Sequence, residues 1–133
     1  MTWSRTSLLL ELLPLRLAVC RLAPDAATPP WAAGSALSCV TRTRSELSVL
    51  AEERLVPGDV RAEREYRAFV VNGPLPFDLV GVLASMTAPL ADAGVSVFAL
   101  STYDTDYVLV KEHDVARAAD VLRAEGHVIA GGE

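Results

Sequence analysis

The chain has 133 residues, 51% of them hydrophobic, which suits one compact domain or two very small ones that share a core. Twelve Lys and Arg residues stand against seventeen Asp and Glu residues, and the net charge is -5. Because this balance leaves no basic field to neutralise phosphates, we expect no nucleic-acid partner.

The apolar run near the N-terminus predicts a strand rather than a signal or a membrane span. Glu11, Pro14 and Arg16 interrupt this run, which is shorter than the roughly 20 apolar residues that a spanning helix needs. Cys20 and Cys39 lie in apolar runs without the spacing of a metal pair or a redox motif, which indicates a reducing compartment. We therefore expect a cytoplasmic protein with no membrane partner.

The first half of the chain reads as short strands joined by loops. Apolar runs predict strands over residues 7–12, 15–22 and 36–43. The loop between the last two strands is indicated by four breakers, Pro24, Pro29, Pro30 and Gly34, and has room for one turn at Trp31. Ser45 is a suitable N-cap for a short helix that ends before Pro57, and residues 58–65 are expected to form a charged linker.

The second half predicts two helices among four strands. A strand over residues 66–72 leads through a proline-rich turn to Asp78, which can cap a helix that ends at Gly94. The apolar positions of this helix repeat at helical spacing: Leu79, Val82, Leu83, Met86 and Leu90. Further along the chain we expect strands over residues 95–101 and 107–111, a helix from Asp114 to Gly126, and a strand over residues 127–130. The order β-α-β-β-α-β predicts an α+β fold with helices on one face of an antiparallel sheet.

Both faces of the strand predicted over residues 95–101 are apolar. Val95, Val97 and Ala99 point one way, and Phe98 and Leu100 point the other. Helices of a single unit can cover only one face, so the other face needs the first half of the chain or a second copy of the protein. We therefore expect association of such units, including a homodimer.

Residue by residue, the sequence offers no catalytic machinery. Neither Ser85 nor Ser101 has the flanking glycines of a nucleophile elbow, and the two histidines, His113 and His127, lie at element ends without a paired ligand. The candidate metal ligands are acidic residues around the predicted hairpin, namely Asp104, Asp106, Glu112 and Asp114. A run such as DTD is, however, common in turns that bind no metal. We expect no enzyme activity, no metal and no cofactor.

Polar residues gather at two joints of the second half. Asp78 and Gly81 lie at the strand-to-helix joint, where free backbone N–H groups favour a ligand carboxylate. The hairpin tip carries Thr102, Tyr103, Asp104 and Asp106. A carboxylate there can pair with an ammonium or guanidinium group, so the two joints together suit a zwitterion. Taken alone, such residues are more often only a helix cap, a packing glycine and turn residues.

Several runs of the sequence are similar to one known family. They are Gly81 at the predicted helix start, LADAGVSV over residues 90–97, STYDTDYVLV over residues 101–110, and, in the first half, CVTRT over residues 39–43 followed by ELSV over residues 46–49. With these runs the chain resembles ACT domains, the amino-acid-sensing modules of regulated biosynthetic enzymes. It resembles especially the branch of the CASTOR arginine sensors and of small stand-alone bacterial ACT proteins.

The resemblance implies two tandem ferredoxin-like ACT units, a degenerate one over residues 1–60 and a complete one over residues 61–133. It also implies a free amino acid held at a unit interface and no catalytic residues. The ligand-binding residues that it implies are Asp78, Leu79, Val80, Gly81, Thr102, Tyr103 and Asp106, with Ser48 and Val49 from the first half. The first half departs from the family pattern, because prolines stand where a first helix would lie.

Two functions of different classes follow. The first is a non-enzymatic regulatory sensor that binds a free amino acid and changes its association when the ligand is bound. The alternative is a structural oligomerisation or protein-interaction module that keeps the fold and has lost the ligand.

Overall fold

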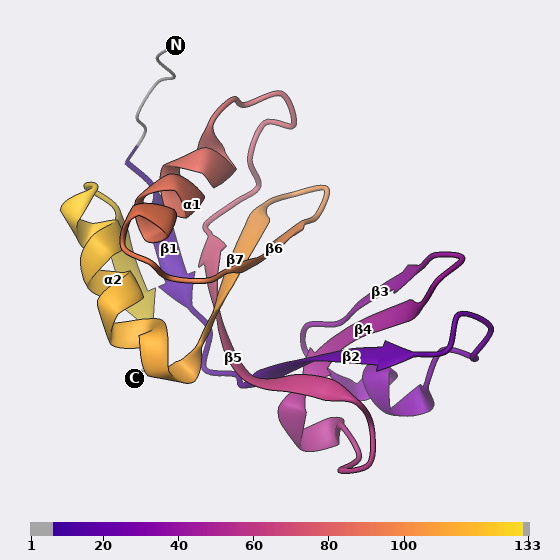
Figure 1. Cartoon of the computed structure of the whole chain (residues 1–133). Helices are drawn as coiled ribbons and strands as arrows, with labels where there is room; N and C mark the ends of the chain where they lie inside the picture. Colours follow the sequence, from indigo (N-terminus) through magenta and orange to yellow (C-terminus); the bar gives the residue numbers. More distant parts are fainter. Residues whose placement is uncertain (1–6, 132–133) are drawn as a thin grey trace. The chain divides into compact units, whose positions relative to one another are not determined.

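The computed structural model describes residues 7–131, and the chain divides into two compact units (Figure 1). The main unit contains the chain up to Pro14 and from Arg67 onward, and the small unit contains Leu15–Tyr66. This division differs from the predicted one at residue 60, because the first strand hydrogen-bonds with strands of the C-terminal half. The order of segments along the chain therefore does not match the order of units.

The main unit is a mixed sheet, antiparallel except for the parallel β1–β8 pair, with two helices on one face (Figure 1). Its elements are β1 (Leu9–Leu12), β5 (Ala62–Val71, which begins in the small unit), α1 (Val82–Asp92), β6 (Phe98–Ser101), β7 (Asp106–Lys111), η3 (Glu112–Asp114), α2 (Val115–Ala124) and β8 (Val128–Gly131). From β5 onward the strands and α-helices follow the order β-α-β-β-α-β, which confirms the predicted α+β arrangement. None of the helices in the described residues is long and apolar enough to cross a membrane.

The N-terminal strand is inserted into the sheet of the main unit. In β1, Leu10 lies opposite Val71 of the antiparallel strand β5 and opposite Ile129 of the parallel strand β8. On its other side β5 pairs with β7, which pairs with β6, so the strand order is β6-β7-β5-β1-β8. A strand from the start of the chain therefore separates the first and last strands of the β-α-β-β-α-β segment.

The core of the main unit lies between the sheet and the helices. Every second strand residue faces the helices, and each helix contributes one apolar face. The core residues with 0% exposure are Leu10, Phe69, Met86, Leu90, Val108, Val110, Ala118 and Leu122. Phe69 of β5 is the largest of them, so its ring fills the centre of this layer.

The small unit contains the antiparallel strands β2 (Leu17–Leu22), β3 (Cys39–Arg42), β4 (Leu47–Glu52) and the start of β5, through which they belong to the same hydrogen-bonded sheet as the other strands. It also contains two short 3-10 helices, η1 (Pro30–Gly34) and η2 (Glu53–Leu55). The helix predicted after Ser45 is wrong, because residues 47–52 form β4, which pairs with both β2 and β3. Alternate residues of β4 are buried in the core of this unit, which gives the period of a strand. The linker predicted over residues 58–65 is also wrong in part, since β5 begins at Ala62.

Cys20 belongs to the core of the small unit, where it is 1% exposed. Burial raises the pKa of the Cys20 thiol, against a smaller opposing effect of the Arg64 charge. The thiol is therefore protonated and shielded, which makes it an unreactive packing residue. Cys20 and Cys39 are both free cysteines.

A buried carboxylate at the end of β4 makes the small unit sensitive to acid. Glu52 is 7% exposed, and its Oε2 accepts a hydrogen bond from the Ala36 N–H at 2.7 Å. The Arg54 side chain donates to Oε1 at 3.1 Å. The Ala36 N–H is the largest cause of the lowered pKa of the Glu52 carboxyl, burial opposes it, and Arg54 lowers the pKa further.

We expect acid to destabilise the small unit through Glu52. Since the pKa is lower in the folded state, the unfolded state binds more protons at acid pH, and stability falls as the pH drops below the ordinary Glu value of about 4.3. Glu52→Gln removes this contribution. It lowers the free energy of unfolding by on the order of 1 kcal/mol at neutral pH and makes that free energy depend less on pH between pH 4 and pH 3. Urea unfolding from pH 7 to pH 3 measures both effects. Glu46→Gln is the matched control for the loss of one negative charge. If that variant loses the same part of the pH dependence of unfolding, Glu52 is not the cause.

Candidate functional site

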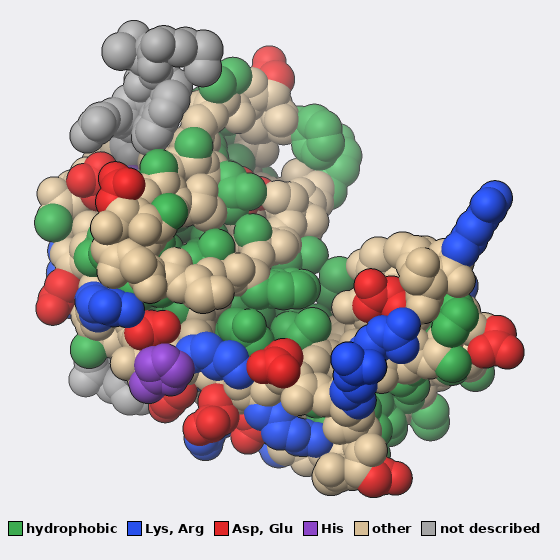
Figure 2. Space-filling model, in the orientation of Figure 1, with side chains coloured by type: hydrophobic (Ala, Val, Ile, Leu, Met, Phe, Trp, Pro, Cys, Tyr) green, Lys and Arg blue, Asp and Glu red, His purple; other side chains and the backbone are tan. Residues whose placement is uncertain are grey.

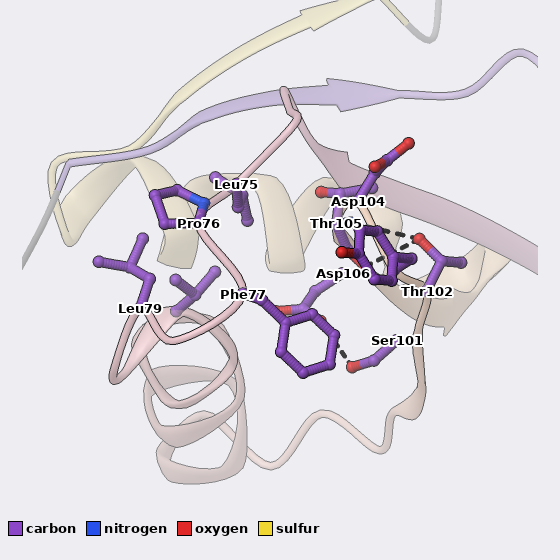
Figure 3. A pocket seen from close by; sticks show the side chains of 11 residues that line it. Leu75, Pro76, Phe77, Leu79, Ser101, Thr102, Asp104, Thr105 and Asp106 are labelled. Carbon is purple, nitrogen blue, oxygen red and sulfur yellow. Dashed lines mark hydrogen bonds between the residues drawn. The ribbon is translucent and has the colours of Figure 1, made fainter.

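A pocket of about 530 Å³ opens in the main unit between two loops (Figure 3). One wall comes from the segment between β5 and α1: Leu75, Pro76, Phe77, Leu79 and Val82. The other wall comes from the β6–β7 hairpin: Ser101, Thr102, Tyr103, Asp104, Thr105 and Asp106. The volume lies within the range of about 300–1,000 Å³ that is typical of small-molecule sites.

Backbone contacts hold the two walls together. The Leu75 N–H donates to the Asp104 carbonyl oxygen at 2.7 Å, and the Thr105 hydroxyl donates to the Val71 carbonyl oxygen at 2.6 Å. Gly73 lies where the two walls are close together, since a Cβ atom there would stand 3.1 Å from the Asp104 carbonyl oxygen. A larger residue would therefore push the loop and the hairpin slightly apart.

The start of α1 differs from the sequence prediction. The helix begins at Val82, and Gly81 precedes it with φ 85°, a left-handed conformation that glycine adopts at low cost. No side chain caps this end, so the prediction that Asp78 is the N-cap is wrong. Instead, residues 76–81 form a loop in which the Leu79 N–H donates to the Pro76 carbonyl oxygen at 3.1 Å. Because Val82 lines the pocket, the uncapped start of α1 lies at the edge of the site.

The hairpin presents a fixed set of polar groups to the pocket. Ser101 and Asp106 are direct partners in the β6–β7 ladder, and the Ser101 hydroxyl donates to the Asp106 carboxylate at 2.5 Å. The turn is closed by Thr102, whose N–H donates to the Thr105 carbonyl oxygen at 2.8 Å and whose hydroxyl accepts the Thr105 N–H at 3.2 Å. These bonds orient the Asp106 carboxylate before any ligand arrives.

The charge of the pocket is negative and its rim is aromatic. The charged residues among those that line it are Asp104 and Asp106, and no Lys, Arg or His is among them. At the rim the Phe77 and Tyr103 rings lie 5.4 Å apart, although 78% and 82% of these residues are exposed. Acidic groups and exposed aromatic faces both attract cations, so the pocket is suited to a ligand that carries a positive charge and an apolar stem.

Four of the predicted site residues are brought together in this pocket: Leu79, Thr102, Tyr103 and Asp106. Asp78, Val80 and Gly81 belong to the same loop but are not among the lining residues. Ser48 lines a different pocket, of about 210 Å³, in the small unit, and the Val49 side chain is fully buried in the core of that unit. Leu75, Phe77 and Ser101 line the pocket but were not predicted as site residues. The proline-rich turn could have indicated the first two, and the hairpin could have indicated Ser101.

In the part of the chain that the structure describes, no group of three or more His, Cys, Asp or Glu residues is placed to hold a metal ion. His113 is largely exposed, 3.5 Å from Asp114, whereas His127 is 4% exposed. On the face drawn in Figure 2, Lys and Arg side chains lie among Asp and Glu side chains and form no basic patch.

Comparison with protein families gives two matches. The family model described as ACT domain matches residues 61–124, and a model for an N-terminal domain matches residues 16–59. Cytosolic arginine sensor for mTORC1 subunit 1 from Homo sapiens is 40% identical over 55 residues, which are 40% of this chain and 17% of that protein. The chain spans only 15% to 31% of the length of the curated relatives it matches.

Solved structures extend the similarity to nearly the whole chain. A crystal structure of a protein from Agobacterium tumefaciens is 33% identical, covers 96% of both chains and has a TM-score of 0.90. The regulatory subunit of aspartate kinase from Thermus thermophilus covers 90% of this chain and 99% of its own, with a TM-score of 0.61. At 9% identity, the second likeness is one of fold alone.

Proposed function

Because residues 61–124 match the ACT domain family and the chain has the ferredoxin-like α+β fold of that domain, we propose that it is a non-enzymatic regulatory module that binds a free amino acid. The binding site in this proposal is the pocket between the β5–α1 loop and the β6–β7 hairpin. The observation that carries the proposal is the composition of that pocket, which joins an oriented carboxylate to an apolar wall.

The pocket offers complementary groups to both ends of an amino acid. Asp106, held by Ser101, accepts hydrogen bonds from an ammonium or guanidinium group. The uncapped N–H groups at the start of α1, beside Val82, are positioned to receive a carboxylate, which the helix dipole also favours. Leu75, Pro76 and Leu79 cover the aliphatic stem. Asp78 and Val80, next to this wall, are proposed to contribute from the same loop.

The relatives support a regulatory role without catalysis. One matching protein is named a cytosolic arginine sensor, and one structure of the same fold is the regulatory subunit of an aspartate kinase. We extend to this chain a cytoplasmic location, association as a homodimer, and L-arginine as the first ligand to test. The positive charge of the arginine side chain matches the acidic lining of the pocket.

A thermal-shift screen of the twenty amino acids at millimolar concentration tests the proposal. We expect a basic amino acid, L-arginine first, to raise the melting temperature, because a ligand at 100 times its Kd stabilises the folded state by about 2.7 kcal/mol. L-Citrulline is the matched control, since it has nearly the same shape and no charge on the side chain. If no amino acid shifts the transition, the proposal fails and the alternative of a protein-interaction module is favoured. Sedimentation with and without L-arginine then reports whether association depends on the ligand.

A further inference from the structure

A buried histidine in the main unit lies outside the proposed binding site. His127 lies just before β8, is 4% exposed, and has both ring nitrogens in hydrogen bonds to the backbone. Its Nδ1 is 3.0 Å from the Leu8 nitrogen, and its Nε2 is 3.1 Å from the Ser85 carbonyl oxygen. Burial and two partners fix the imidazole in a single orientation.

The partners determine the protonation state of the ring. A backbone N–H can only donate, so the Nδ1 that faces Leu8 must be an unprotonated acceptor. A carbonyl oxygen can only accept, so the Nε2 that faces Ser85 must carry the proton. The described geometry therefore requires the neutral imidazole with its proton on Nε2.

The imidazole joins segments that are far apart in the sequence. Leu8 directly precedes β1, Ser85 lies in the first turn of α1, and the His127 N–H donates to the Leu122 carbonyl oxygen at the end of α2 at 3.2 Å. One side chain and its backbone therefore connect the inserted strand with both helices of the main unit.

The connection continues to the pocket. The Ser85 hydroxyl donates to the Val82 carbonyl oxygen at 2.6 Å, and the Ser85 N–H donates to the Gly81 carbonyl oxygen at 2.9 Å. Val82 lines the pocket, and Gly81 ends the loop that forms one of its walls. Ser85, which contacts the His127 ring, is therefore hydrogen-bonded to both residues at the start of α1 beside the site.

We propose that His127 is a proton-sensitive positioning residue for the pocket. Its neutral imidazole holds Ser85 and Leu8 in place, and protonation at Nδ1 puts two N–H donors face to face and releases Leu8. Once it is no longer fixed by Leu8, the imidazolium moves together with the Ser85 carbonyl oxygen, to which its Nε2–H still donates, so the first turn of α1 shifts and the affinity for an amino acid in the pocket falls. This consequence for binding rests on the proposed function, whereas the effect of the proton on Leu8 and Ser85 does not.

In any pH experiment, the effect of a proton on His127 must be distinguished from the titration of charged residues on the surrounding elements. They are Glu11 on β1, Asp92 at the end of α1, and Arg117, Asp120, Arg123 and Glu125 on or just after α2. Carboxylates ordinarily titrate near pH 4 and arginine above pH 12, so these side chains keep their charges between pH 5.5 and pH 7.5. The chain has two histidines, and the exposed His113 is the natural control.

The first arm of the experiment is a pH titration of the ¹⁵N-labelled full chain by NMR. We expect the His127 ring nitrogens to show the neutral form with the proton on Nε2 at pH 7.5. As the pH falls to 5.5, the amide signals of Leu8, Ser85 and Val82 should move together with the His127 titration. If His127 stays neutral down to pH 5.5, or if these amides stay still while it gains a proton or follow His113 instead, the proposal is overturned.

The second arm measures binding of L-arginine by calorimetry at pH 7.5 and pH 5.5. We expect the affinity of the wild type and of His113→Gln to fall about tenfold, and that of His127→Gln, whose amide can accept from Leu8 and donate to Ser85, to stay constant. An unchanged pH dependence in His127→Gln contradicts the proposal. If L-arginine binds at neither pH, the proposed function fails for this ligand. The role of His127 is then decided by the movement of the Val82 amide signal in the NMR titration. The NMR titration also decides the role of His127 if the His127→Gln variant does not fold.

Discussion

Asp106→Asn is expected to weaken the binding of L-arginine by about tenfold to a hundredfold while leaving the fold intact. Asp106 lies in the pocket, and its carboxylate is oriented by the Ser101 hydroxyl at 2.5 Å. A hydrogen bond to a charged group contributes about 1.5–3 kcal/mol, and each 1.4 kcal/mol is a factor of about ten in Kd. The asparagine amide keeps the shape and can still accept from Ser101, so the loss reports the charge.

Calorimetry with L-arginine on the wild type and two variants measures this effect. The control is Asp120→Asn on α2, which makes the same change of charge at a side chain outside the pocket that is 82% exposed. We expect Asp120→Asn to bind L-arginine with the affinity of the wild type. Equal affinity of all three proteins would exclude Asp106 as the group that pairs with the cation, and equal weakening in both variants would assign the effect to net charge.

Phe69→Ala is expected to lower the free energy of unfolding by about 3–5 kcal/mol, the largest single-residue cost in the main unit. Phe69 is 0% exposed, lies on β5 in the centre of the sheet, and packs in the core that both helices share. Removing the ring leaves a cavity that residues of β1, α1 and α2 cannot fill without leaving their own positions.

Phe77→Ala is the matched control for this substitution. It removes the same atoms from a residue that is 78% exposed at the rim of the pocket, where little packing is lost. We expect its free energy of unfolding to stay within about 0.5 kcal/mol of the wild type. Urea unfolding followed by circular dichroism compares the two variants, and similar midpoints for both would contradict the description of the core.

The elements of the main unit were predictable where the sequence pattern is local. The apolar spacing of Val82, Met86 and Leu90 predicted α1, and Gly94 closes it with φ 75°, as expected of a left-handed cap. The small unit was harder to predict. Residues 47–52 follow a plausible N-cap at Ser45, but pairing with β2 and β3 makes them a strand, because burial between two neighbours outweighs local propensity.

The candidate site was predictable in part. The hairpin residues Thr102, Tyr103 and Asp106 were identified from the polar turn and the family resemblance, and the structure places all three in one pocket. Asp78 was assigned as a helix cap because the sequence does not show that Gly81 takes a left-handed conformation, which delays the start of α1 to Val82. The sequence did not predict that Phe77 lines the pocket, because a loop has no periodicity from which the direction of a side chain could be inferred.

The sequence by itself determined the β-α-β-β-α-β order, the acidic hairpin and the resemblance of residues 61–124 to ACT domains, since each depends on residues that are close together in the chain. Only the tertiary structure decided that β1 enters the sheet between β5 and β8, that Gly73 meets Asp104 across the pocket, and that His127 joins Leu8 to Ser85. These contacts join residues 31 to 119 positions apart. Local periodicity does not encode such pairings, because they are selected by how the whole core packs.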